Sequence, residues 1–120
     1  MSEELKDRTK RFGLDVIRLC AGLPRRQECL VIGRQVIRSA TSVGANYRSA
    51  LRARSRAEFV SKLAIAEEEA DETLYWLELL QELLPARTEE LGRLSREAGE
   101  LLAIVVASKK TAKSRQESVS

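Results

Sequence analysis

The sequence contains no histidine and only two cysteines, and aromatic residues make up just 4% of it. Without histidine the chain lacks the commonest general base and the commonest metal ligand of proteins. The thiols of Cys20 and Cys29 consequently have no imidazole to activate them, and no other nucleophile is paired with a base. We therefore expect a protein that is not an enzyme and that uses no cofactor and no metal.

The chain also lacks a long apolar segment and a secretory signal. No apolar run is long enough to span a bilayer. The first residues, MSEELKDRTKR, are polar throughout, unlike a signal peptide. We expect a cytoplasmic protein with no membrane partner, in which both thiols are buried and reduced.

Glycine and proline are scarce, with six and two residues, whereas alanine, leucine, glutamate and arginine dominate. This composition favours long helices, and 120 residues most simply form one domain. Apolar residues recur three and four positions apart along most of the chain, which is the spacing of one helix face. The periodicity predicts helices at residues 3–21, 26–52, 56–84 and 89–108.

Residues that start or stop helices support these bounds. Gly22 and Pro24 end the first pattern, since glycine suits a helix C-cap and proline cannot continue a helix. Ser55 precedes Glu58 by three residues, the spacing of a capping box that satisfies free backbone N–H groups at a helix start. Pro85 ends the third pattern because the residue before a proline avoids the helical conformation.

Small residues accompany the apolar stripe of the second predicted helix. Gly33, Ala40 and Gly44 lie on or beside it, so a neighbouring helix can approach closely there. Four helices joined by short turns pack most simply as an all-α, antiparallel up-down-up-down four-helix bundle. We assign residues 1–110 to this bundle and expect the polar residues 111–120 to form a disordered basic tail.

Charge is distributed unevenly along the chain, although the net charge is only +3. Residues 1–62 hold 14 Lys or Arg and 6 Asp or Glu, residues 63–107 hold 3 and 11, and residues 108–120 hold 4 and 1. The first part is strongly basic and the second equally acidic. Such polarity bears on partners and surfaces rather than on the fold.

The basic charge is concentrated on one face of the second predicted helix and on the turn that follows it. At 100° per residue, this face lies roughly 140° from the apolar stripe. Guanidinium groups donate paired hydrogen bonds to phosphate, so the face favours salt-sensitive binding to the backbone of RNA or DNA. No aromatic residues are interleaved for base stacking. The candidate nucleic-acid-binding residues are Arg25, Arg26, Arg34, Arg38, Arg48, Arg52, Arg54, Arg56 and Lys62.

Two other interpretations of these arginines stay open. One is a solvated helix face that has no partner. The other is a contact with the acidic third helix of a neighbouring subunit, because head-to-tail contacts that close generate rings. The protein is then a self-assembling scaffold or adaptor whose partner is another protein. The candidate subunit-interface residues are Glu68, Asp71, Trp76, Glu78 and Glu82.

The acidic run of the third predicted helix does not have the pattern of a metal site. Di-iron bundles pair inward glutamates with Glu-x-x-His motifs, and most carboxylates here face away from the apolar stripe. Glu69 is an exception at the edge of the stripe. A half-buried carboxylate at that position needs a partner such as an arginine.

Three runs in this order resemble one bacterial protein family. They are RSATSVGAN at 38–46, RSRAEF at 54–59 and LAIAEEEADETLYWLELL at 63–80, and LPRRQECLVIGRQVIRSA at 23–40 is similar to the loop and second helix of the same family. The family comprises small four-helix-bundle proteins first noticed as products of intervening sequences in 23S ribosomal RNA. Its members usually continue Asn-x-x-Glu-Gly, where this chain has Asn-Tyr-Arg-Ser-Ala at 46–50.

The resemblance implies a four-helix bundle that is often assembled as a homopentameric ring. The family also resembles the accessory protein of diversity-generating retroelements, a basic pentameric bundle that binds a reverse transcriptase and nucleic acid. Most members have no established activity. The family pattern supplies no catalytic residue that can be transferred to this chain.

Overall fold

The computed structural model describes the backbone of residues 2–119 and the side chains of residues 3–115. Over that part of the chain it contains four α-helices, one short 3₁₀-helix and no strand. The elements are α1 (Ser2–Ala21), α2 (Gln27–Leu51), α3 (Arg56–Leu83), the 3₁₀-helix η1 (Pro85–Arg87) and α4 (Thr88–Val119). Each α-helix begins and ends within one residue of the bounds that the sequence predicts, except at the C-terminal end of α4.

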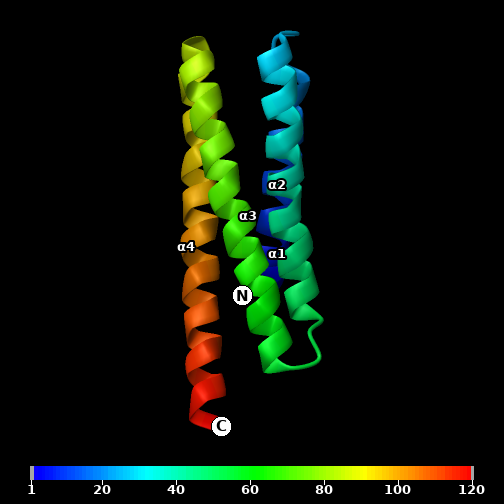
Figure 1. Cartoon of the computed structure of the whole chain (residues 1–120), viewed down its shortest axis with the longest axis vertical. Coiled ribbons are helices and arrows are strands. Elements are labelled where there is room, and N and C mark those ends of the chain that lie inside the picture. The colour runs from blue at the N-terminus through cyan, green and yellow to red at the C-terminus, as the bar shows by residue number, and fades with distance from the viewer. Residues whose placement is uncertain (1, 120) are drawn as a thin grey trace.

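The helices run alternately up and down along a rod of 52 × 22 × 19 Å (Figure 1). α3 packs extensively along both α2 and α4, and α1 packs along α2, whereas α1 and α4 meet over a much smaller contact. The predicted all-α antiparallel four-helix bundle is thus confirmed, with one of its four sides less tightly closed than the others.

The core is built from the predicted apolar stripes. The buried stripe of α2 comprises Cys29, Gly33, Val36, Ala40, Val43 and Tyr47. In α3 the stripe is buried from Leu63 to Leu84, and Phe59 at its start is half-buried. Phe12 of α1 is 2% exposed and lies among aliphatic side chains from the other helices. The scarcity of aromatic residues therefore produces a core made mainly of Leu, Val and Ala.

α1 and α2 approach each other closely because glycine lies at their contact. A Cβ atom on Gly44 would lie 3.4 Å from the backbone and Oγ1 of Thr9. A Cβ atom on Gly13 would lie 3.5 Å from Cγ2 of Thr41. The close packing expected at Gly44 is therefore present, and α1 contributes a small residue of its own.

The turn before α3 contains the predicted capping box in a modified form. The backbone N–H of Glu58 donates to Oγ of Ser55 at 3.1 Å. The Glu58 carboxylate reaches one residue further back than expected and accepts from the backbone N–H of Arg54 at 3.2 Å. Both bonds satisfy donors at the helix start, so the turn is well defined.

The expected disordered tail at 111–120 is wrong for residues 111–119, which continue α4. The apolar stripe of α4 extends past Val105 to Ala112, which is 4% exposed. In addition, Nζ of Lys109 lies 2.7 Å from Oε1 of Glu67 on α3. Burial and an ion pair against α3 stabilise turns that a polar composition alone would leave unfolded. Ser120 lies outside the described residues.

Candidate nucleic-acid interface

Three of the four arginines predicted to share a face of α2 are exposed and free. Arg34, Arg48 and Arg52 are exposed, and none has an ion pair or hydrogen bond within the described part of the chain. They sit on the same helix within five turns, so their guanidinium groups are available to an external anion.

The fourth arginine is already occupied. Nη1 of Arg38 lies 2.9 Å from Oε2 of Glu69, and its Nη2 donates to Oε2 of Glu72. The hydrogen bond to Glu72 is the main cause that raises the pKa of Arg38. Trp76 also donates to Glu72, at 2.9 Å, and this bond is the largest single cause that lowers the pKa of Glu72, followed by the hydrogen bond from Arg38. The arginine partner expected for Glu69 is therefore Arg38. Because Arg38 is paired in this way, we no longer count it among the candidate nucleic-acid-binding residues.

The remaining predicted residues divide between the two ends of the rod. Arg54 lies in the turn between α2 and α3, and Arg56 and Lys62 lie in the first two turns of α3. The Arg54 side chain is 92% exposed although its Nε is 3.7 Å from Glu58. Arg25 and Arg26 precede α2 at the opposite end. The predicted residues therefore do not form a single patch.

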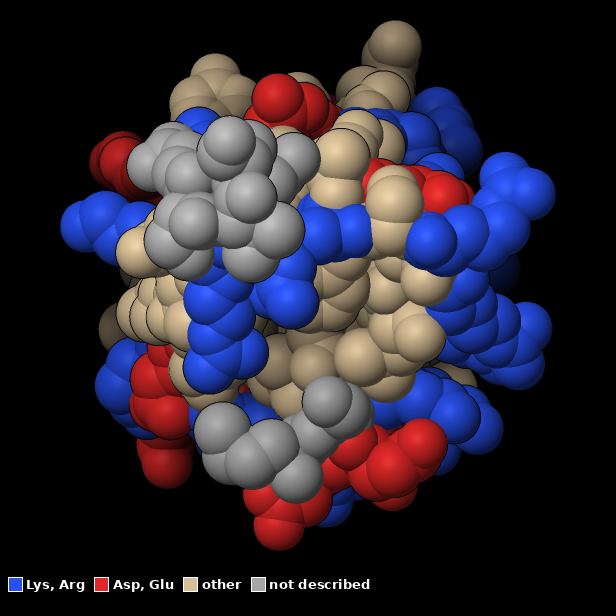
Figure 2. Space-filling model, turned by 90° about the horizontal axis from the view of Figure 1, so that it is seen from below, with Lys and Arg blue, Asp and Glu red and all other residues tan. Residues whose placement is uncertain are grey.

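The end with the α2–α3 turn is also where α4 finishes, as Figure 1 shows. The Lys109–Glu67 ion pair fixes the last turns of α4 beside the first turns of α3. Figure 2 looks onto this end: Lys and Arg side chains occupy much of its rim, around a centre of uncharged residues, with acidic side chains on part of the rim. We call this region the basic end, and its residues are Arg48, Arg52, Arg54, Arg56, Lys62, Lys110 and Lys113.

Two lysines of the basic end, Lys110 and Lys113, are absent from the candidate residues that the sequence predicts. The +3 charge of residues 108–120 was visible in the sequence, but a tail expected to be disordered cannot contribute to a shaped surface. The signal that could have placed these lysines is the apolar stripe of α4, which continues in register to Ala112.

The outward face of α3 carries the predicted acidic residues. Glu68, Asp71, Glu78 and Glu82 are all exposed. Between them Tyr75 is 53% exposed, and its ring meets that of Trp76 edge-on at 5.1 Å between centroids. Trp76 itself is half-buried against the core and donates its N–H to Glu72. Of the two aromatic side chains, Tyr75 is therefore the one that α3 presents to a partner.

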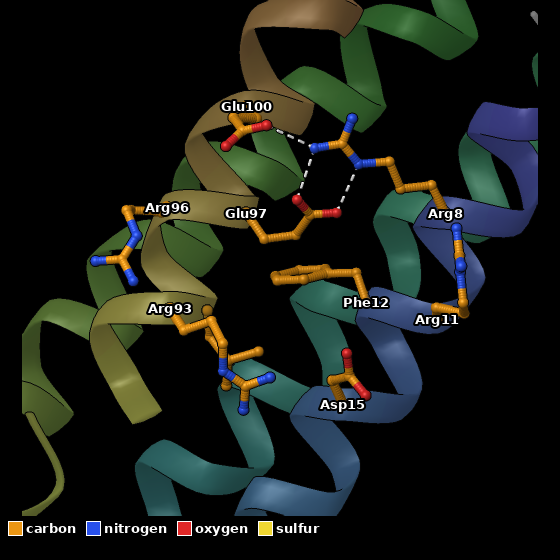
Figure 3. A pocket seen from close by; sticks show the side chains of 9 residues that line it. Arg8, Arg11, Phe12, Asp15, Arg93, Arg96, Glu97 and Glu100 are labelled. Atoms are coloured by element: carbon orange, nitrogen blue, oxygen red, sulfur yellow. Dashed lines mark hydrogen bonds and ion pairs between the residues drawn. The ribbon is translucent and has the colours of Figure 1, made fainter. Parts of the chain in front are cut away.

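A cleft that the sequence analysis did not anticipate lies on the loosely closed side, between α1 and α4 (Figure 3). Arg8 of α1 spans it and contacts two carboxylates of α4, 2.7 Å from Oε1 of Glu97 and 2.8 Å from Oε1 of Glu100. These bonds, that to Glu97 first, raise the pKa of Arg8. The paired residues are about ninety positions apart in the sequence. Helix periodicity relates only residues within a few turns of one helix, so it could not predict this pairing.

Neither Cys20 nor Cys29 forms a disulfide, and both thiols are shielded from solvent to some extent. Cys29 is fully buried, and Cys20 is half-buried with its Sγ 3.7 Å from the carbonyl oxygen of Gly33. Burial raises the pKa of the Cys20 thiol to about 11, so it stays protonated and a poor nucleophile.

The described side chains include no cluster of three or more residues suited to a metal ion. None of the helices in residues 2–119 is long and apolar enough to cross a membrane.

Comparisons with known proteins agree with the fold. The family profile of the 23S rRNA-intervening sequence protein matches residues 3–107 of the chain. The chain is similar to a protein of unknown function from the S23 ribosomal protein family of Bacteroides thetaiotaomicron, whose crystal structure is solved. The two chains are 36% identical with a TM-score of 0.83, and the match covers 91% of this chain and 97% of that one. No curated protein matches the chain.

Proposed function

The chain belongs to the 23S rRNA-intervening sequence protein family, and within that family we propose a non-enzymatic role for it: the protein binds nucleic acid through its basic end. The observation that carries this proposal is the number of exposed cationic side chains at that end without an acidic partner. Arg48, Arg52 and Arg56 come from α2 and the turn, and Lys110 and Lys113 from α4.

The surface suits the phosphate backbone better than the bases. Arginine donates two parallel hydrogen bonds to a phosphate group, and lysine adds a mobile positive charge. Stacking on exposed bases needs aromatic side chains, yet the large apolar side chain most exposed in the described chain, Tyr75, lies on α3 among carboxylates. We therefore infer binding that depends on charge and shape with little dependence on sequence.

The test is a titration of labelled RNA and DNA over a series of salt concentrations. Each phosphate contact contributes about 0.7 to 0.9 to the slope of log K against log salt, so four contacts give a slope of roughly −3. We expect Arg48→Glu/Arg52→Glu to flatten the slope and weaken binding at least tenfold.

The matched control is Arg25→Glu/Arg26→Glu, which makes the same charge change at the opposite end of the rod. It should keep most of the affinity and the slope. Equal weakening by both pairs would reject the basic end as the site, and no binding even at low salt would reject the function.

A second proposal concerns assembly and rests on the outward face of α3. That face combines the exposed ring of Tyr75 with unpaired carboxylates at Glu68 and Glu78, whereas α2 presents the unpaired cations Arg34 and Arg52. The two faces differ in charge and lie on one chain, so a contact between copies is head-to-tail and can close into a ring. Complementary charge would set its register.

Light scattering tests this assembly because one chain has a mass of 13.5 kDa. We expect a mass several times larger, which Glu68→Lys/Glu78→Lys should reduce to that of the single chain. A monomer before any substitution contradicts assembly. An unchanged mass in the double variant shows that α3 is not the contact.

A further inference from the structure

The cleft between α1 and α4 has a volume of about 440 Å³ and an unusual lining for the seam of a helix bundle. Phe12 and Leu94 line it from the core, and both are buried. Four arginines line it as well, Arg8 and Arg11 from α1 with Arg93 and Arg96 from α4. The cleft lies outside the basic end, since none of these residues belongs to that surface.

The arginines of the cleft outnumber its carboxylates, and each of the carboxylates already has an arginine partner. Glu97 and Glu100 are both held by Arg8. Asp15 lies 3.6 Å from Nη1 of Arg18, which stands outside the lining. By contrast, Arg11, Arg93 and Arg96 have no ion pair or hydrogen bond within the described part of the chain. The lining therefore carries three guanidinium groups that make no ion pair, although its four arginines and three carboxylates leave a net formal charge of only +1.

The positions of these arginines indicate the shape of a ligand. In Figure 3 Arg93 extends from α4 across the opening toward α1, while Arg11 and Arg96 stand on the outer rims of α1 and α4. No bond must break for any of the three to turn toward an anion. Because they come from both walls, a chain of linked phosphates offers each guanidinium group a phosphate of its own, which a single small ion does not.

We propose that the α1–α4 cleft binds linked phosphate groups, with Arg93 as the central contact and Arg11 and Arg96 closing on it from the two rims. The guanidinium fork matches two oxygens of one phosphate. The Arg8–Glu97–Glu100 cluster closes one end of the site and keeps its carboxylates turned away from the ligand. A bound oligophosphate would tie α1 to α4, where the bundle itself makes least contact.

The primary experiment is calorimetry and thermal denaturation with inorganic tripolyphosphate, compared with sulfate at matched ionic strength. A ligand that binds only the folded state raises the melting temperature. We expect a saturable rise with tripolyphosphate and little with sulfate. Arg93→Gln/Arg96→Gln should weaken binding at least tenfold, whereas Arg25→Gln/Arg26→Gln, which removes the same charge outside both the cleft and the basic end, should leave it unchanged. Equal loss in both variants overturns the proposal.

A substitution of Asp15 should strengthen tripolyphosphate binding, whereas the arginine substitutions should weaken it. It is the lining carboxylate that Arg8 does not hold, and it lies on the wall that Arg93 faces (Figure 3). Asp15→Asn removes a negative charge from the wall that Arg93 faces, so tripolyphosphate binding should tighten several-fold. A purely structural effect of the arginine substitutions would not produce such a gain. Weaker binding by Asp15→Asn counts against the site.

Linked phosphates can come from a nucleoside triphosphate or from a nucleic acid backbone. Two competition experiments against tripolyphosphate binding distinguish these sources. Competition by ATP with no competition by a short RNA lacking a 5′-phosphate identifies a terminal polyphosphate, and the reverse identifies a backbone. The site stands apart from the proposed function. If Arg93→Gln/Arg96→Gln abolishes tripolyphosphate binding while the salt-dependent RNA titration is unchanged, the cleft and the basic end are separate sites.

Discussion

Ser39 and Thr73 are polar residues at the centre of the interface between α2 and α3, and both are fully buried. Their hydroxyl oxygens lie 2.8 Å apart, and each is also within hydrogen-bonding distance of a carbonyl oxygen one turn earlier in its own helix. A buried polar pair that is satisfied in this way costs little in the native register. If the helices slide, the hydrogen bond between them is lost and each hydroxyl keeps only the carbonyl of its own helix, so the pair favours one alignment.

A double-mutant cycle measures this pair. We expect Thr73→Val to lower the free energy of unfolding by about 1–2 kcal/mol, because the hydroxyl of Ser39 loses its partner across the interface. Ser39→Ala/Thr73→Val should recover much of that loss, since both polar groups are then gone. Urea unfolding supplies the values, and strictly additive losses would contradict the coupling.

Glu72 makes stability depend on pH. The hydrogen bond from Trp76, and then Arg38, lower its pKa in the folded state below the ordinary value of 4.5. The stability that it adds is therefore complete above that value and is lost as the pH falls through the lower folded-state pKa. Glu72→Gln should remove roughly 0.5–1 kcal/mol at neutral pH. Trp76 fluorescence reports the unfolding, and a difference that persists in strong acid would contradict the mechanism.

At the scale of the helix, adding a side chain at either of two glycines should have opposite effects on stability. A Cβ atom on Gly99 of α4 would meet nothing within 4 Å, whereas one on Gly44 of α2 would touch the backbone of Thr9 at 3.4 Å. Both glycines carry the conformational cost of a residue without a side chain inside a helix. Only the one on α2 makes a close approach that offsets this cost.

We predict that Gly99→Ala raises the free energy of unfolding by about 0.5–1 kcal/mol through helix propensity alone. Gly44→Leu should lower it by about 1–3 kcal/mol, because the added atoms force α1 away from α2. Thermal denaturation of the two variants compares them directly. Stabilisation by both would mean that the α1–α2 contact is not tight.

Arg8 makes the ion pairs that join α1 to α4 in the described part of the chain, across the cleft. Arg8→Ala should therefore loosen α1 more than it destabilises the whole bundle, since an ion pair at a partly exposed site contributes about 1 kcal/mol or less. Hydrogen exchange followed by mass spectrometry should show faster exchange in residues 3–21, while exchange in the buried centre of α3 is unchanged. Uniform acceleration throughout the chain would show that α1 is not a separate unit.

At the scale of the whole molecule, the length of α4 determines the shape and charge of the basic end. Ala112→Asp places a charge where the helix packs, so it should cost about 1–3 kcal/mol and lower the helical content near the C-terminus. Ala107→Asp is the matched control, because Ala107 is exposed on the same helix. Circular dichroism and unfolding measurements distinguish them, and equal effects would contradict the packing of the last turns.

Most of the fold could be predicted because its signals are local. The 3- and 4-residue spacing from Cys29 to Tyr47, the Ser55–Glu58 cap and the stop at Pro85 each act within a turn or two of helix. The error at residues 111–119 has a physical origin as well. Composition marked them as polar, but the burial of Ala112 and the ion pair of Lys109 with α3 decide their conformation.

The sequence by itself determined the number of α-helices, their bounds except at the C-terminal end of α4, and the faces that they bury, because these follow from periodicity and capping. Only the tertiary structure decided which charged groups are free. The register between α2 and α3 brings Arg38 to Glu69 and Glu72, and the crossing of α1 and α4 brings Arg8 to Glu97. Such pairings depend on how packed side chains align distant helices, so the arginines left unpaired appear only once the bundle has formed.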